Sequence, residues 1–415
     1  MILSKYWIRA LVVLFTMCLP TLIYGQSKSV SLDEAIGMFK QNSLERLVFS
    51  YNQEMEQGNA LNYKAYPNPE VSILHESLNA GSPDYDETTF LISQPLELLG
   101  QPFLRRKSAV ALSEASQLEF EHQEQLLIAK MKSLYVSHWY LSKRLEVVSQ
   151  ALESVNEIRQ SALARKEEGA YSTIQFQRFN IEYGRYLRLR DEIQSKLTLT
   201  SNQLILLLSP EDKREGTLQF TENFSVDPIS DTEGSILEYA LQNRSDLKQA
   251  EQLVTANDLQ YTVERRERFP DLNLDFGYKS QSNGSEGFVI GGSLKLPIFN
   301  QNKGNVIRTQ AQARSSAIEL ELKISTIKNE VIAAYQRVSL LQEQWKELQT
   351  FSSNTSMLET ARISYKEGEY SLLELLDAIE AYVDAQRLFH QTISEYNQAL
   401  FSLDVASGGK LFSTN

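Results

Sequence analysis

Two carboxylates near the C-terminus are spaced so that together they could attract cations. Glu374 and Asp377 lie in the helix-forming stretch Leu372–Ala378. Residues three positions apart share one face of a helix, so both side chains would project from the same side. A solvated helix face is the simpler interpretation of such a pair, and the spacing alone does not exclude it.

The histidines and glycines of the sequence are not arranged as in a catalytic or cofactor-binding site. The four histidines, His75, His122, His138 and His390, lie far apart and form no metal-ligand spacing. No glycine-rich phosphate loop follows a predicted strand, and Gly291-Gly292 lies within one, which indicates a bend or a close backbone approach. The sequence therefore predicts no enzyme, no cofactor and no metal site.

The composition and the first residues predict an exported protein. Residues 1–25 contain Lys5 and Arg9, an apolar run and a small residue at Gly25, which is typical of a cleaved signal peptide. Cys18 is the only cysteine, so the mature chain would have neither disulfides nor a thiol nucleophile. A net charge of −12 argues against a nucleic-acid partner.

The remaining chain consists of two similar sequence repeats. Tyr66-Pro67 recurs as Phe269-Pro270, and Gly169 recurs as Gly368, each about 200 residues later. Such ordered repetition indicates internal duplication. We predict a first repeat at 26–208, a linker in the equatorial region at 209–233, a second repeat at 234–406 and a tail at 407–415.

Each repeat is predicted to contain one very long helix that returns at a glycine. Residues 103–168 and 305–367 contain neither glycine nor proline and are rich in helix formers. An unbroken helix of that length would span about 95–100 Å, which no globular core could bury, so a coiled coil is expected. Shorter helices at about 171–208 and 371–405 would return from Gly169 and Gly368. Further helices are expected at about 32–64 and 236–268. In each repeat, this helix and the returning helix would lie end to end alongside the long helix.

A predicted two-stranded hairpin interrupts the helices of each repeat. Residues 271–298 alternate apolar and polar side chains on either side of a turn at 282–287, and residues 71–96 repeat this less regularly. Four strands with an apolar outer face at the end of a long rod must bury that face in lipid or in a partner. Because a membrane barrel needs at least eight strands and no free edges, several chains would have to share one barrel.

This organisation resembles the TolC-like outer membrane efflux proteins, over essentially all of the mature chain. The most specific stretches are Tyr365–Ala378 with Ala385-Gln386, and Leu296–Asn305, which is similar to the heavy-metal (cation efflux) branch. The resemblance implies a mainly α fold with a small β part, in which a long antiparallel coiled-coil α-barrel joins a 12-stranded outer-membrane β-barrel shared by a homotrimer. It implies a protein in the outer membrane lipid of a Gram-negative bacterium that extends into the periplasm. A periplasmic adaptor (membrane fusion protein) and an inner-membrane resistance-nodulation-division pump would be its partners.

The resemblance also assigns roles to residues at the periplasmic tip. Glu374 and Asp377 would form two acidic rings at a tunnel constriction, which could select for cations. Tyr365 matches a tyrosine that helps to hold the entrance of drug-exporting members shut, but Tyr370 and Gln175 replace the arginine and aspartate that pair there. The constriction is therefore predicted to comprise Glu374, Asp377, Tyr365, Tyr370 and Gln175, and the adaptor-docking tips Glu168, Gly169, Glu367 and Gly368.

Three functions follow from these observations. The favoured one is a passive exit duct for small solutes, particularly metal cations, in a tripartite efflux system. The same fold could serve type I protein secretion or drug efflux. A periplasmic adaptor or structural coiled-coil protein is the alternative of another class, but an adaptor should contain a lipoyl-like β domain that the sequence does not show.

Overall fold

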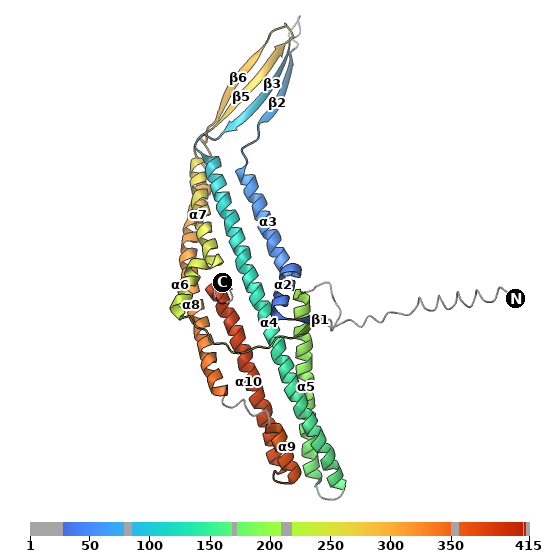
Figure 1. The fold of residues 1–415 in the computed structure, drawn as a ribbon. Coiled ribbons are helices and arrows are strands. Elements are labelled where there is room, and N and C mark those ends of the chain that lie inside the picture. The colour runs from blue at the N-terminus through green and yellow to red at the C-terminus, as the bar shows by residue number, and fades with distance from the viewer. Residues whose placement is uncertain are drawn as a thin grey trace, which may run out of the picture.

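Long helices run along most of the molecule and a four-stranded sheet extends from one end (Figure 1). The computed structural model describes residues 28–78, 85–167, 172–208, 218–349, 357–409 and 411. The expected signal peptide lies outside them, and so do Glu168 and Gly169. None of the helices in the described ranges is long and apolar enough to cross a membrane.

The helices of the first repeat confirm the predicted arrangement around one long helix. Helix α4, Gln101–Glu167, has 67 residues. Helices α3, Leu44–Lys64, and α5, Thr173–Leu208, both pack along it, one beyond the other (Figure 1). In the second repeat, α7, Ser245–Arg266, and α10, Leu372–Ser407, pack in the same way on α8, Lys303–Gln349. The α4 helix also packs on α7 and α10, which joins the two repeats.

Two predicted helices are divided in the structure, and a third is described in two parts. The expected single helix at 305–367 is described as α8 and a separate α9, Met357–Glu367. The sequence between them, 350–356, lies outside the described residues and is rich in Ser, Thr and Asn, which are poor helix formers. The shorter helices divide at Ser43 and Arg244, giving α2, Leu32–Asn42, before α3 and α6, Glu233–Asn243, before α7. At Ser43 the backbone is extended and its hydroxyl accepts a hydrogen bond from Arg46 N, so Ser43 caps α3.

The sheet combines the hairpins of both repeats. Strands β2, Glu70–Leu78, β3, Tyr85–Leu96, β5, Asp271–Gln281, and β6, Glu286–Lys295, are antiparallel in the order β2-β3-β5-β6. Apolar side chains align across one face, as in the row Ile73, Phe90, Tyr278 and Phe288. The Phe288 side chain is 79% exposed. The structure therefore confirms the predicted hairpins and leaves their apolar face uncovered in the single chain.

The opposite face of the sheet is mainly polar. Glu87 forms an ion pair with Lys279 and accepts a hydrogen bond from Gln281 at 2.9 Å. Gly277 is required on this face because a Cβ there would lie 2.3 Å from the carbonyl oxygen of Phe90. The two faces thus differ as the wall of a water-filled barrel would require.

A second, smaller sheet was not predicted from the sequence. Strand β1, Lys28–Val30, pairs in parallel with β4, Leu218–Phe220. The Tyr135 hydroxyl of α4 donates a hydrogen bond to the carbonyl oxygen of Val30 at 2.6 Å, and its ring packs edge-on against Phe220. This sheet fastens the start of the first repeat to the segment that joins the repeats. Strands of three residues carry too little periodic signal to be recognised.

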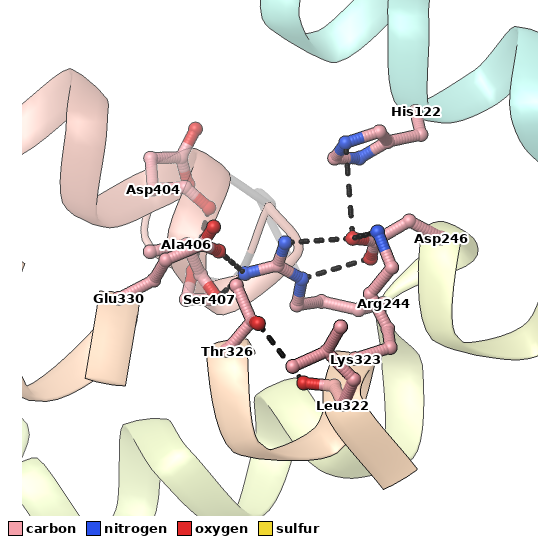
Figure 2. A network of polar contacts seen from close by, with 10 residues as sticks. All are labelled: His122, Arg244, Asp246, Leu322, Lys323, Thr326, Glu330, Asp404, Ala406 and Ser407. Atoms are coloured by element: carbon pink, nitrogen blue, oxygen red, sulfur yellow. Dashed lines mark hydrogen bonds and ion pairs between the residues drawn. The ribbon is translucent and has the colours of Figure 1, made fainter. Parts of the chain in front are cut away.

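Arg244, at the division between α6 and α7, is the centre of a buried polar network (Figure 2). Its guanidinium donates two hydrogen bonds to Asp246, at 2.9 and 2.8 Å, one to Glu330 at 2.7 Å and one to the carbonyl oxygen of Ala406 at 3.1 Å. The side chain of Arg244 is only 4% exposed. It therefore joins the start of α7 to α8 and to the last turn of α10.

Asp246 also interacts with its other neighbours in this network. His122 Nε2 lies 3.8 Å and Lys323 Nζ 3.4 Å from its carboxylate. Burial would raise the pKa of Asp246, but the hydrogen bonds from Arg244 and the nearby cations lower it to about 2. The ionised carboxylate therefore stabilises the fold above the ordinary aspartate pKa of 3.8, and this contribution is lost as the pH falls through about 2.

We predict that Arg244→Ala lowers the free energy of unfolding by about 3–5 kcal/mol, because it leaves the buried Asp246 without its main partner. The matched control is Arg337→Ala, which removes an exposed pair with Glu395 and should cost no more than about 1 kcal/mol. Thermal unfolding in detergent, followed by circular dichroism, measures both. Equal effects of the two substitutions would show that the network does not fasten these helices.

Candidate constriction at the helical tip

The second repeat turns at its tip through Gly368. Gly368 has φ +82°, a conformation that favours glycine. Glu369 N donates to the carbonyl oxygen of Ser364 at 2.9 Å, and Gly368 N to that of Tyr365 at 3.2 Å, which satisfies the last turn of α9. Of the predicted docking tips, Glu367 is the last residue of α9 and Gly368 forms the turn. Glu168 and Gly169 lie outside the described residues.

Glu374 caps the helix on which it lies. Ser371 N donates to the Glu374 carboxylate at 2.7 Å, and Glu374 N donates to Ser371 Oγ at 3.4 Å, which together form a capping box at the start of α10. Hydrogen bonding of the carboxylate to Ser371, to its side chain first and to its backbone N–H second, lowers the pKa of Glu374 below its ordinary value. The carboxylate therefore remains ionised to a lower pH than an uncapped glutamate would.

Gln175 has the same role in the first repeat. Ser172 N donates to the Gln175 side-chain oxygen at 2.9 Å, and Gln175 N donates to Ser172 Oγ at 3.2 Å. Both repeats thus have the same helix cap, but the capping side chain is a charged carboxylate in the second repeat and a neutral amide in the first. The pattern of Ser followed three residues later by Glu or Gln is a helix-start signal that the sequence offers at both positions.

A groove between α5 and α10 brings the predicted acidic pair together with other charged residues. It has a volume of ≈ 460 Å³, and Glu374 and Asp377 lie side by side along it on α10. Its remaining lining comes from both helices: Arg178, Ile181, Glu182, Leu373, Leu376 and Glu380. Four carboxylates line the groove with Arg178, and Arg185 lies at one end, so the groove is acidic on balance.

An ion pair crosses this groove at its end away from the tip. Arg185 of α5 and Glu380 of α10 approach to 2.6 Å, and Arg185 also lies 3.4 Å from Glu182. Hydrogen bonding to Glu380 raises the pKa of Arg185. The pair links the two repeats on the face that carries Glu374 and Asp377. This link was not predicted, because residues 195 positions apart give no local pattern.

The two predicted tyrosines do not line this groove. Tyr365 is buried in the core between α4, α5, α9 and α10, and it borders a separate pocket with Glu157 and Ile158 of α4. Tyr370 is half-exposed beside the turn. The structure thus brings Glu374 and Asp377 together, whereas Tyr365 lies at the packed side of the tip. Across the described ranges, no cluster of three or more His, Cys, Asp or Glu side chains could hold a metal ion.

Comparisons with known proteins place this architecture in a class. Residues 236–409 match the model of the family described as outer membrane efflux protein. The solved structure of CusC has a TM-score of 0.76 to this one, with 19% identity over 91% of this chain and 92% of that one. The long helical hairpins and the two-faced sheet are thus those of a TolC-like outer membrane channel.

Relatives by sequence agree with this class. The cobalt-zinc-cadmium resistance protein CzcC of Cupriavidus metallidurans is 21% identical over 94% of this chain and 92% of its own length. The cation efflux system protein CusC of Escherichia coli K12 is 28% identical over 52% of this chain and 49% of its own length. Residues 236–409 thus match the outer membrane efflux protein family, and the similarity to CzcC extends over almost the whole chain. The chain is an outer membrane efflux channel of a Gram-negative bacterium, similar to members of the heavy-metal branch.

The capping bonds predict different results for two substitutions of Glu374. Glu374→Gln should leave the first turn of α10 as stable as before, because Gln175 makes the same cap in the first repeat. Glu374→Ala removes the acceptor for Ser371 N and should let that turn fray. Amide hydrogen exchange at residues 372–375 measures this, and we expect several-fold faster exchange in the alanine variant only. Equal exchange in both variants would exclude the cap.

Proposed function

We propose that three copies of this chain form one exit duct through the outer membrane, with twelve strands in its barrel and the helices as a tunnel. Small solutes, metal cations in particular, would pass through it from a periplasmic adaptor and a resistance-nodulation-division pump. The proposed trimer rests on a single observation, the four-stranded sheet. Its apolar face is exposed, and in the described residues β2 and β6 each pair on one side only.

The charge of the α5–α10 groove supports cations as the cargo. Carboxylates on one helix face, repeated around a threefold axis, would surround the tunnel with negative charge, which favours cations over anions. The named functions of the relatives, cobalt-zinc-cadmium resistance and cation efflux, point the same way. Protein secretion and drug efflux have no comparable support from the groove.

The family works with adaptor and pump partners, and the tips of this chain are the proposed contact with the adaptor. Glu367 ends α9 and Gly368 forms the turn that follows it, at the extremity of the second repeat. Glu168 and Gly169 hold the same place in the sequence of the first. With both repeats present in three copies, the adaptor would meet six similar tips.

The proposed assembly predicts a trimer in mild detergent. Light scattering coupled to size-exclusion chromatography should give a protein mass three times that of the chain, because only a multimer leaves no free strand edge in lipid. As a control, the same sample unfolded in dodecyl sulfate should have the mass of one chain. A folded monomer in mild detergent would contradict the shared barrel.

The proposed cation selectivity predicts a charge effect on conduction. The double variant Glu374→Gln with Asp377→Asn should lower the ratio of cation to anion permeability of single channels in planar bilayers. The glutamine keeps the cap, so the change removes charge rather than structure. The matched control, Glu54→Gln with Glu153→Gln, removes two exposed charges from other helices.

The permeability ratio of this control should equal that of the wild type. An unchanged ratio in the Glu374 and Asp377 variant would remove the acidic rings from the proposal, although the trimer would stand. The effect should persist at a pH slightly below the ordinary glutamate pKa, since the pKa of Glu374 is lowered.

A further inference from the structure

Basic side chains are concentrated where the sheet joins the helices. Four chain segments meet there, 64–70, 97–108, 264–271 and 295–308, and they contain ten Lys or Arg against five Asp or Glu. The whole chain, in contrast, has a net charge of −12. We call these four segments the basic collar.

Contacts join three of the four segments, 97–108, 264–271 and 295–308, into one structure. Arg105 forms an ion pair with Glu97 and lies 3.6 Å from Glu267. Arg266 donates a hydrogen bond to the carbonyl oxygen of Leu99, and the Asn302 side-chain amide donates to that of Glu264 at 3.0 Å. The collar therefore crosses the molecule at the base of the sheet (Figure 1).

The direction of Arg105 shows which residues lie on the other side of α4. Arg105 lies with its partners Glu97 and Glu267 in one pocket, which Phe269 and Phe299 also line. Phe103 and Lys107 are each two positions from Arg105, and two helix positions correspond to a rotation of about 200°. Phe103 and Lys107 therefore project from α4 on the side away from the Arg105 ion pairs.

The exposed surface of the collar combines aromatic and basic groups. Lys107 Nζ lies 4.6 Å from the centre of the Phe103 ring, and Phe103 is 61% exposed. Phe299 is completely exposed, and Phe269 and Ile298 are also exposed. Aromatic rings favour the interface of a membrane, and basic side chains beside them reach the depth of lipid phosphates. Exposed basic residues at this level are Arg106, Lys107, Arg265, Arg268 and Lys303.

We propose that the basic collar binds anionic phospholipid headgroups of the leaflet that faces the helices. Its outward cations would pair with lipid phosphates while Phe103 and Phe299 enter the edge of the acyl layer. This binding would fix the depth of the barrel and orient the acidic helices away from the membrane. The proposal rests on the membrane position of the sheet and does not depend on the cargo.

The test measures thermal stability of the full-length protein in neutral detergent. Because a ligand of the folded state raises the melting temperature, phosphatidylglycerol should raise it more than the same amount of phosphatidylcholine. Arg106→Gln with Lys107→Gln should weaken phosphatidylglycerol binding by roughly thirtyfold, since each basic residue near an anionic surface contributes about fivefold. The matched control, Lys328→Gln with Lys346→Gln, removes two exposed charges far along α8 and should bind as the wild type does.

Salt and inorganic phosphate distinguish a lipid site from a site for any soluble anion. High salt should remove the difference between the two lipids, and inorganic phosphate alone should not raise the melting temperature. Equal effects of both lipids on the wild type, or an Arg106 and Lys107 variant that keeps the full phosphatidylglycerol effect, would overturn the proposal. An equal effect of inorganic phosphate would identify a soluble-anion site and would also overturn it. Without lipid, the variant should have the melting temperature and oligomeric mass of the wild type, which shows that it folds. If the trimer proposal is wrong, the oligomeric mass would show it, and the lipid measurements would not.

Discussion

Unpaired strand edges within lipid are the constraint on which this architecture depends. A bilayer offers no hydrogen bonds to the free backbone groups of an open sheet, so every edge must pair. The sheet of this chain has four strands and two edges, β2 and β6, and its apolar residues face outward. Its completion requires other copies. The duplication contributes two hairpins to each copy, so three copies reach twelve strands.

The helices extend the same repetition away from the membrane. In each repeat two shorter helices lie end to end along a longer one, and α4 joins the repeats by packing on α7 and α10. Within the second repeat, Arg244 joins α7 to α8 and α10, whereas Ser43 caps α3 at the corresponding position of the first repeat. The repeats also differ at the tip, where Gln175 and Glu374 make the same cap with different charges. The shared contacts maintain the fold, and the differing side chains give the tunnel its chemistry.

Repetition and periodicity made most of the fold predictable. The glycine-free stretch at 103–168 predicted α4, and the alternation around Phe276 predicted the hairpin. The helix division at Arg244 could not be predicted, because its stability comes from Asp246, Glu330 and Ala406, and the last two are distant in sequence. At the tip, the sequence predicted that Glu374 and Asp377 share a face. It did not predict that Arg185 and Glu380 pair across the groove, nor that Tyr365 packs on α4.

Crosslinking between strand edges tests the central claim most directly. In a Cys18→Ser background the chain has no cysteine, so single cysteines can be paired between Glu70–Leu78 of β2 and Glu286–Lys295 of β6. These strands lie at opposite edges of the sheet in one copy. A shared barrel predicts that some pairs oxidise to covalent trimers, with reactive positions alternating along each strand. If every pair remained monomeric in native outer membranes, the shared barrel would be contradicted.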